Sequence, residues 1–243
     1  MSLKATGLPR DGPLTVASGI GVNARVRGGI SAMQTGPISG RTVGVASTLA
    51  VGGASLVYGA VLLIGLAARS SASDPIADPW LVAMEMLILF IAPCMTLVIW
   101  SIDARARSVP RGRGRLSVVF MAACATITFG VHLVLLSGPR AAAEAAFRWP
   151  SPFYLLDILA WDVFFALAVL LAAPLVRGGG LARLTRWLLV LSGLLALAGL
   201  IGVPTGDMNL RNIGILGYAV VFPAAALVLG LIFWRAGESP HLR

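Results

Sequence analysis

Residues 153–174, FYLLDILAWDVFFALAVLLAAP, form an apolar run that is long enough to cross a bilayer and yet contains two carboxylates, Asp157 and Asp162. A transmembrane helix needs about 20 mostly apolar residues to span the hydrocarbon core. A charged side chain in that core is costly unless it is paired, hydrated or protonated, so each aspartate requires a partner or a function. This run therefore predicts a membrane-spanning helix that carries a polar site.

The composition of the whole chain supports the same conclusion. Of its 243 residues, 58% are hydrophobic and only 12% are charged, which is outside the range of ordinary soluble domains. The net charge of +9 comes almost entirely from arginines between apolar runs, and membrane topology explains that distribution better than nucleic-acid binding does. We predict an all-α, polytopic integral membrane protein whose partner is the lipid bilayer and not a nucleic acid.

Six apolar runs predict a six-helix bundle that occupies residues 43–234. The expected spans are about 43–68, 80–102, 116–137, 153–175, 187–204 and 210–234. Residues 1–42 are rich in Gly, Ser and Arg without apolar periodicity, which predicts a disordered tail, and Met33 is an alternative start. Residues 235–243 are expected to form a short C-terminal tail.

The distribution of basic residues predicts the orientation. Of the 19 Lys and Arg residues, 15 lie in the two tails and in the loops after spans two and four, and the other four lie in or beside the remaining loops. Because basic residues accumulate on the cytoplasmic side, both termini are predicted to be cytoplasmic. The scarcity of Lys and the excess of Ala, Gly and Arg indicate a bacterial genome, which places the protein in the cytoplasmic (inner) membrane.

The loop between spans two and three is the most basic segment of the chain. Its arginines are Arg105, Arg107, Arg111, Arg113 and Arg115. Beside anionic headgroups, each would contribute about 1 kcal/mol of attraction. We expect this loop to act mainly as the topology determinant, with contact to anionic lipid as a by-product.

Small residues and prolines indicate how the helices pack. Small residues recur at a spacing of four, which lets backbones approach closely. The repeats include Ala46 with Ala50 and Ala54, and Ala226 with Gly230. Pro93 and Pro223 fall within spans two and six, where the missing N–H predicts kinks.

Ionisable residues gather at one depth of the predicted bundle. Glu85, His132 and Asp157 each lie about five residues, or ~8 Å, below the outer ends of spans two, three and four. They are expected to share one polar layer in the outer half of the membrane. Asp207 is expected to cap the last helix, and together with Arg211 it would complete the layer if its loop dips into the bundle.

Helical geometry separates the two aspartates of the fourth span. Five residues turn an α-helix by about 500°, which leaves Asp157 and Asp162 about 140° apart. We therefore expect two separate surroundings, with Asp157 in the outer layer and Asp162 deeper, beside Trp161. If no partner reaches Asp162, it is expected to be protonated.

These groups favour a small transporter, a channel-like protein or a sensor that binds a cation, a proton or a small polar ligand. The candidate site residues are Glu85, His132, Asp157, Asp162, Asp207 and Arg211. A first alternative is a structural subunit, homo-oligomeric or bound to another membrane protein, in which the same groups form fixed ion pairs. A second is a membrane-embedded, metal-dependent hydrolase.

The hydrolase alternative would use Glu85, His132 and Asp157 as metal ligands. However, the chain has no HExxH spacing and no G-x-S-x-G motif, and Cys94 and Cys124 lie in apolar spans and form no CxxC pair. The sequence therefore leans against an enzyme, and it supports no catalytic residue, metal site or cofactor.

Overall fold

The computed structural model describes residues 40–70, 76–106, 111–139, 146 and 149–236, apart from the side chains of Arg111 and Met208. The chain divides into two units, Met1–Thr35 and Gly36–Arg243, and every described residue belongs to the second. The predicted tail up to residue 39, the alternative start at Met33 and the C-terminal residues from 237 lie outside the described residues.

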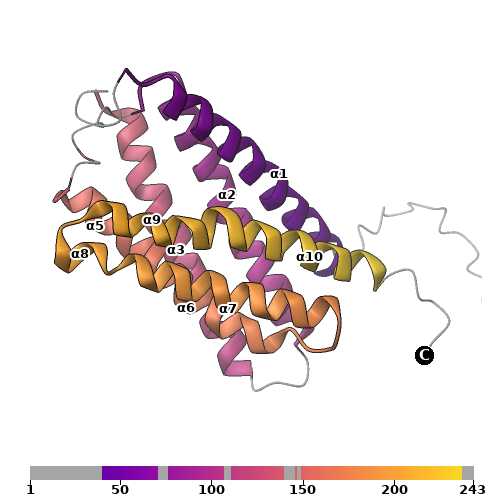
Figure 1. Cartoon of the computed structure of the whole chain (residues 1–243). Helices are drawn as coiled ribbons and strands as arrows, with labels where there is room; N and C mark the ends of the chain where they lie inside the picture. The colour runs from indigo at the N-terminus through magenta and orange to yellow at the C-terminus, as the bar shows by residue number, and fades with distance from the viewer. Residues whose placement is uncertain (1–39, 71–75, 107–110, 140–145, 147–148, 237–243) are drawn as a thin grey trace, which may run out of the picture. The chain divides into compact units, whose positions relative to one another are not determined.

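The first three spans are uninterrupted α-helices (Figure 1). They are α1 (Gly40–Ala67), α2 (Trp80–Arg105) and α3 (Arg111–Ser137). Both α1 and α3 begin before the predicted spans, because hydropathy marks the part of a helix that crosses hydrocarbon and not the polar turns that extend it. Pro93 lies inside α2, which continues as one helix on both sides of it.

The last three spans change their winding along their length. The fourth contains α5 (Pro152–Ile158), the π-helical segment η1 (Leu159–Phe165), α6 (Ala166–Ala172) and the short 3₁₀ turn η2 (Ala173–Leu175). The fifth contains α7 (Leu181–Gly199) and α8 (Gly202–Thr205). The sixth contains α9 (Met208–Leu216), the π-helical segment η3 (Gly217–Val221) and α10 (Phe222–Arg235).

Each of these six spans is long and apolar enough to cross a membrane, and the described residues contain no strand. The chain is therefore an all-α, multi-pass membrane protein, as predicted. The fifth helix begins at Leu181 and not near 187, because the Arg- and Thr-containing turn before Trp187 is helical without being hydrophobic. Near Pro223 the predicted irregularity takes the form of η3, since this proline has no N–H for the carbonyl of Ala219.

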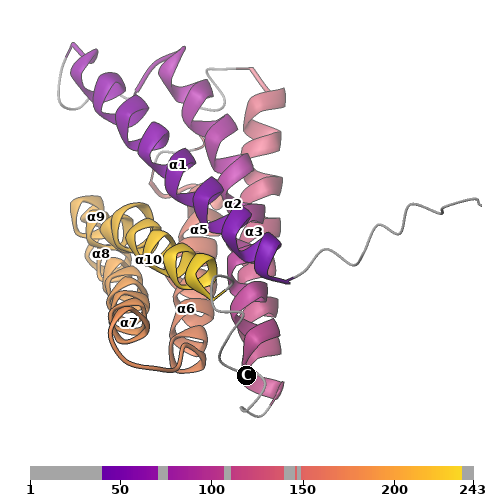
Figure 2. The ribbon, with the colours of Figure 1, turned by 90° about the vertical axis from the view of Figure 1, so that its right-hand side faces the viewer.

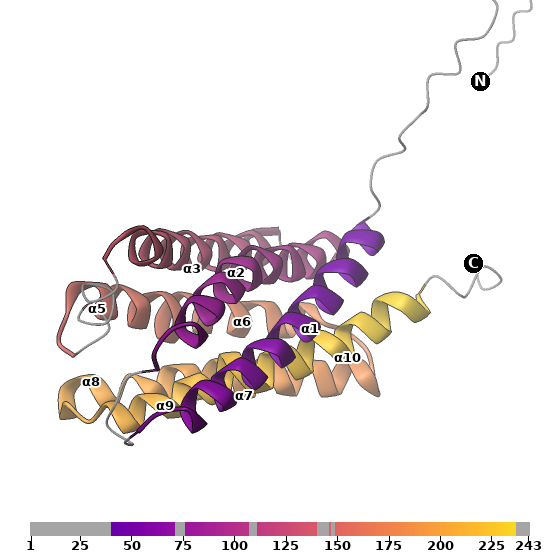
Figure 3. The same ribbon diagram turned by 90° about the horizontal axis from the view of Figure 1, so that it is seen from above.

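Spans that follow one another in the sequence pack side by side, and the last returns to the first. Each helix contacts the next in the order α1, α2, α3, α6, α7 and α10. The last of them, α10, also packs against α1 and closes a ring. Figure 2 shows α1, α2 and α3 next to one another, and Figure 3 shows α5 and α6 between α3 and α7. The centre of this ring is filled by fully buried side chains, among them Met95, Ile99, Phe165 and Phe222.

Glycines allow α1 and α10 to approach closely. A Cβ atom on Gly230 would lie 2.7 Å from Oγ1 of Thr48, and one on Gly44 would lie 2.5 Å from the ring of Phe233. Gly230 was in a predicted small-residue repeat, but Ala46 of the other repeat is exposed. The first span carries small residues at spacing four in two registers, and periodicity alone did not identify which register faces α10.

The bundle has two ends, named here by a tryptophan at each. Trp80, at the start of α2, marks the Trp80 end, where α1 and α3 finish and α5 and α9 begin. Trp234, in the last turn of α10, marks the opposite Trp234 end. Large apolar side chains such as Leu56, Leu63 and Val119 are more than half exposed on the outside of the bundle, as expected of surfaces that face lipid.

Candidate functional site

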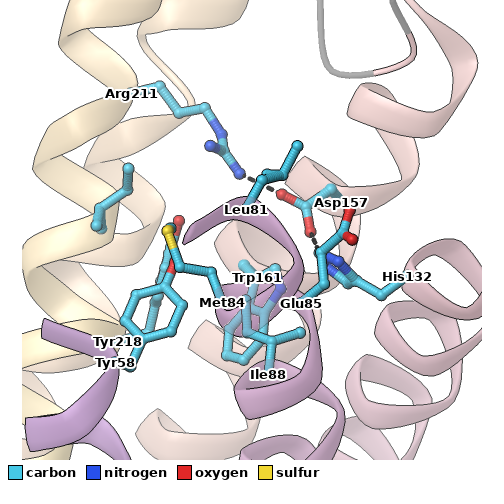
Figure 4. A pocket seen from close by; sticks show the side chains of 11 residues that line it. Tyr58, Leu81, Met84, Glu85, Ile88, His132, Asp157, Trp161, Arg211 and Tyr218 are labelled. Atoms are coloured by element: carbon cyan, nitrogen blue, oxygen red, sulfur yellow. Dashed lines mark hydrogen bonds and ion pairs between the residues drawn. The ribbon is translucent and has the colours of Figure 1, made fainter. Parts of the chain in front are cut away.

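A cavity of about 190 Å³ lies inside the bundle, and Figure 4 shows the side chains that line it. It lies nearer the Trp80 end, because Leu81 and Met84 in its wall belong to the first turns of α2. Spans one, two, three, four and six contribute to its wall. The lining residues are Tyr58, Leu81, Met84, Glu85, Ile88, His132, Asp157, Trp161, Arg211, Ile215 and Tyr218. Several of them, including Tyr58, Met84 and Ile215, are only half-buried, so the cavity is not sealed within the chain.

Arg211 is the central charge of the cavity wall. It lies on α9, is 6% exposed, and donates a hydrogen bond of 2.7 Å from Nη2 to Oδ2 of Asp157. Its guanidinium carbon also lies 4.8 Å from the centre of the Tyr154 ring, within the range of a cation–π contact. The same guanidinium therefore meets a carboxylate and an aromatic face from α5, and it ties the sixth span to the fourth.

Local sequence signals hold both partners of this ion pair in position. Ser151 caps α5 by accepting a hydrogen bond from the backbone N–H of Tyr154, and Pro152 occupies the first turn, where a missing N–H costs nothing. Asp207 caps α9 in the same way, through the N–H of Asn209 at 2.9 Å. Arg211 lies one turn into α9, so its cap fixes the start of the helix that carries it.

Asp162 reaches the same guanidinium as Asp157. Its Oδ2 lies 3.6 Å from Nε of Arg211, and its side chain is fully buried. This distance makes an ion pair and not a hydrogen bond, and neither carboxylate oxygen has a hydrogen-bond partner among the described residues. Arg211 is thus the partner that the sequence did not identify, and the expectation of two separate surroundings is wrong.

The π-helical segment η1 explains the convergence of the two aspartates. The angle of about 140° assumed 3.6 residues per turn, but Leu159–Phe165 follows the i to i+5 hydrogen bonding of a π-helix. In that winding, residues five apart lie near the same face. Asp157 and Asp162 are five apart, so the extra residue in the turn brings both toward Arg211.

Gly214 makes room for Asp162 against α9. A Cβ atom at this position would lie 2.6 Å from Oδ1 of Asp162 and 3.3 Å from the carbonyl oxygen of Ala196 on α7. Any larger residue would displace the carboxylate or separate the helices. The approach of Asp162 to α9 therefore depends on a glycine one turn after Arg211.

Glu85 and His132 join Asp157 at the cavity, as the predicted polar layer requires. His132 places Nε2 3.7 Å from Oδ1 of Asp157, so Asp157 lies between a histidine and an arginine (Figure 4). Glu85 is 2% exposed and lies on the turn of α2 that faces them. Side chains from four spans thus meet in one layer of the bundle.

Asp207 takes no part in this cluster. Its side chain is exposed at the Trp80 end and serves as the cap of α9, one of the two roles predicted for it. Arg211 lies inside the bundle because its turn of α9 packs closely against the end of α7, where a Cβ atom on Gly199 would lie 3.2 Å from the carbonyl oxygen of Arg211. Of the two candidate charges in this region, Asp207 lies at the surface and Arg211 lines the cavity.

Tyrosines are the site residues that the sequence prediction missed. The chain has three, and all of them surround the charged cluster: Tyr58 and Tyr218 line the cavity, and Tyr154 covers Arg211. A signal was present in the sequence, since each tyrosine lies within an apolar span. A tyrosine inside a span carries a hydroxyl that usually finds a polar neighbour, so it points to a polar site.

The basic loop between α2 and α3 is only partly described. The guanidinium of Arg105 lies 4.2 Å from the centre of the Phe233 ring. Arg113 and Arg115 are exposed at the Trp234 end. Arg107 and the side chain of Arg111 lie outside the described residues, and lipid contact by this loop stays a prediction.

The three expected metal ligands border one cavity without forming a metal centre. Among the described residues, no three His, Cys, Asp or Glu side chains cluster closely enough to hold a metal ion. One carboxylate oxygen of Asp157, Oδ2, already accepts a hydrogen bond from Arg211. The arrangement is that of a charged cavity and not of a coordination sphere.

Fold and site together define the class: a multi-pass helical membrane protein with charged side chains around a cavity within its membrane-spanning part. No protein-family model, curated protein or solved structure matches the chain. The function must therefore be argued from the cavity.

Proposed function

We propose that this chain is a small transporter of the bacterial cytoplasmic membrane whose cavity binds a cation in exchange for protons. The observation that carries the proposal is the imbalance of charge around Arg211. Asp157 and Asp162 both contact this one guanidinium, and Glu85 borders the same cavity. Intramembrane carboxylates that face a bundle interior are typical of ion and proton pathways.

The imbalance favours cations and protons over anions. One guanidinium offsets one carboxylate, so Asp157 and Asp162 leave one surplus negative charge beside Arg211 when both are ionised. Negative charge in a low-dielectric site is relieved either by protonation or by a bound cation. A proton and a cation therefore compete for the same carboxylates, and this competition is the physical basis of cation–proton exchange.

Access and direction follow from the predicted topology. If both termini are cytoplasmic, the Trp80 end is the outer end, and the cavity lies in the outer half of the membrane. The fully buried residues around Phe165 and Phe222 then separate it from the cytoplasmic side. A second, inward-open arrangement of the same helices would complete the transport cycle.

Proteoliposomes that contain the full chain and the pH indicator pyranine test this function. An imposed pH gradient is followed after addition of Na⁺, K⁺ or phenyltrimethylammonium, a permanently charged cation that does not carry protons by itself. We expect at least one of these cations to release protons from the vesicles. Glu85→Gln and Asp157→Asn should each slow the release at least about tenfold.

The matched control is Asp103→Asn, which removes a carboxylate near the Trp234 end that lies against Gly114 and away from the cavity. This variant should exchange at the rate of the unchanged protein. If no cation releases protons, or if both cavity variants keep the full rate, the chain is not an exchanger that uses these carboxylates.

A structural role is the second candidate, and the Arg211–Asp157 hydrogen bond favours it. A buried ion pair between spans six and four fixes helix positions even when nothing is bound. A partner subunit of this kind would copurify with another membrane protein or as an oligomer. It would also retain that assembly when Glu85 becomes Gln, because an amide of nearly the same size preserves the packing of this buried side chain.

A further inference from the structure

A smaller apolar recess adjoins the cavity. This recess holds about 30 Å³ and is bordered by Ser55, Tyr58, Ile88, Ile91, Trp161, Tyr218 and Ala219. Four of these residues also line the main cavity: Tyr58, Ile88, Trp161 and Tyr218. The two adjoining spaces thus present a charged wall at Asp157 and an aromatic and aliphatic wall at Trp161.

Packed side chains of the two π-helical segments form the aromatic wall. The rings of Trp161 in η1 and Tyr218 in η3 lie 4.9 Å apart between centroids, and Phe165 packs edge-on against Tyr218 at 6.0 Å. Trp161 is only 4% exposed and Phe165 is fully buried. The aromatic surfaces are therefore in place before any ligand arrives, so little ordering is needed on binding.

This combination of walls suits one class of ligand. An organic cation is attracted both by carboxylates and by aromatic faces within about 6 Å, while its apolar part is driven out of water. An inorganic cation would need several oxygen ligands, which leucine, isoleucine and methionine side chains in the wall do not supply. An organic anion would meet the acidic side chains, and Arg211 is already engaged by Asp157.

We propose that the cavity binds an ammonium cation that carries an apolar group, with the charge near Glu85 and Asp157 and the apolar group against Trp161 and Tyr218. This assignment rests on the proposed exchange function and specifies its substrate class. The size of the space agrees with it, because a protein cavity of about 150 Å³ is enough for benzene. The main cavity here holds about 190 Å³.

Isothermal titration of the full-length protein in detergent with phenyltrimethylammonium tests the assignment. We expect this cation to bind at least about tenfold more tightly than tetramethylammonium, which lacks the apolar ring. Benzoate, which has the ring but the opposite charge, should neither bind nor compete. Equal affinity for the two cations, or tighter binding of benzoate, would overturn the proposal.

Substitutions locate the binding site. Trp161→Leu and Tyr218→Leu keep an apolar wall but remove the aromatic face, and each should weaken binding at least about tenfold. Trp161→Phe and Tyr218→Phe restore an aromatic face and should bind within about threefold of the unchanged protein. These conservative variants separate loss of the face from failure to fold.

Trp187→Leu is the matched control, because this tryptophan is 65% exposed on α7 and borders neither space. It should leave the affinity unchanged. If Trp161→Leu and Tyr218→Leu both bind as tightly as this control, the ligand does not use the aromatic wall and the proposal is wrong.

The outcomes distinguish this inference from the transport function. If Na⁺ or K⁺ exchanges with protons but phenyltrimethylammonium does not bind, the proposed ligand class is wrong and the transport function is retained. If binding of phenyltrimethylammonium depends on Trp161 but no cation exchanges with protons in vesicles, the transport function is wrong and the ligand class is retained. Absence of both removes both proposals.

Discussion

Nη2 of Arg211 lies 2.7 Å from Oδ2 of Asp157, although the two residues are 54 positions apart in the sequence. The bond joins the sixth span to the fourth inside the bundle. Because Nε of the same guanidinium lies 3.6 Å from Asp162, one cation positions both carboxylates of the fourth span. The stability of this region and the charge of the cavity therefore depend on the same side chain.

Replacement of Arg211 by glutamine should strongly destabilise the protein. The change leaves the buried carboxylates of Asp157 and Asp162 without their cation, and removal of one partner of a buried ion pair typically costs about 3–5 kcal/mol. Thermal unfolding of the detergent-purified protein, followed by circular dichroism, measures the loss.

The double variant Arg211→Gln with Asp157→Asn serves as the control for this experiment. It removes one uncompensated charge, so it should be more stable than Arg211→Gln alone. If Arg211→Gln unfolds at the temperature of the unchanged protein, the ion pair does not stabilise the bundle.

Both aspartates should couple energetically to Arg211, and Asp157 should couple more strongly. Asp157 accepts a hydrogen bond from the guanidinium, whereas Asp162 contacts it only as an ion pair at 3.6 Å. Double-mutant cycles of Asp157→Asn and Asp162→Asn against Arg211→Gln measure the two coupling energies. A coupling energy of zero for Asp162 would mean that the two aspartates belong to separate sites after all.

Gly217→Ala should destabilise the contact between η3 and α7. A Cβ atom there would lie 2.5 Å from the carbonyl oxygen of Ser192, and this backbone atom has little freedom to move aside. Overpacking of this kind costs about 1–3 kcal/mol. Gly53→Ala, where the new atom meets nothing within 4 Å, is the matched control and should unfold like the unchanged protein. Equal unfolding temperatures for the two variants would contradict the close packing of η3 on α7.

Cysteine labelling should establish the orientation of the bundle. In a background with Cys94 and Cys124 replaced by alanine, Ser70→Cys follows α1 at the Trp80 end, and Gly179→Cys lies between η2 and α7 at the opposite end. With both termini cytoplasmic, a membrane-impermeant maleimide should label Ser70→Cys in intact cells and Gly179→Cys only after the cells are opened. The reverse pattern would place the cavity in the cytoplasmic half of the membrane.

The sequence placed three polar side chains at a shared depth, because helical spans fix the depth of a residue. Glu85, His132 and Asp157 meet at one cavity, because the rise of 1.5 Å per residue converts a position in a span directly into a depth. The prediction for Asp162 failed because it assumed regular α-helical winding. Whether a span contains a π-helical turn depends on how its side chains pack against neighbouring helices, and the sequence of one span does not contain that information.

By itself, the sequence determined that this chain is a helical membrane protein with six spans, because hydrophobic length and composition decide whether a segment can cross a membrane. It also determined which polar side chains lie at a shared depth. Only the tertiary structure decided which of them touch. Rotation about each helix axis and the local winding of η1 and η3 are set by packing across spans, so the bridge from Asp157 through Arg211 to Asp162, and the aromatic wall beside it, exist only in the assembled bundle.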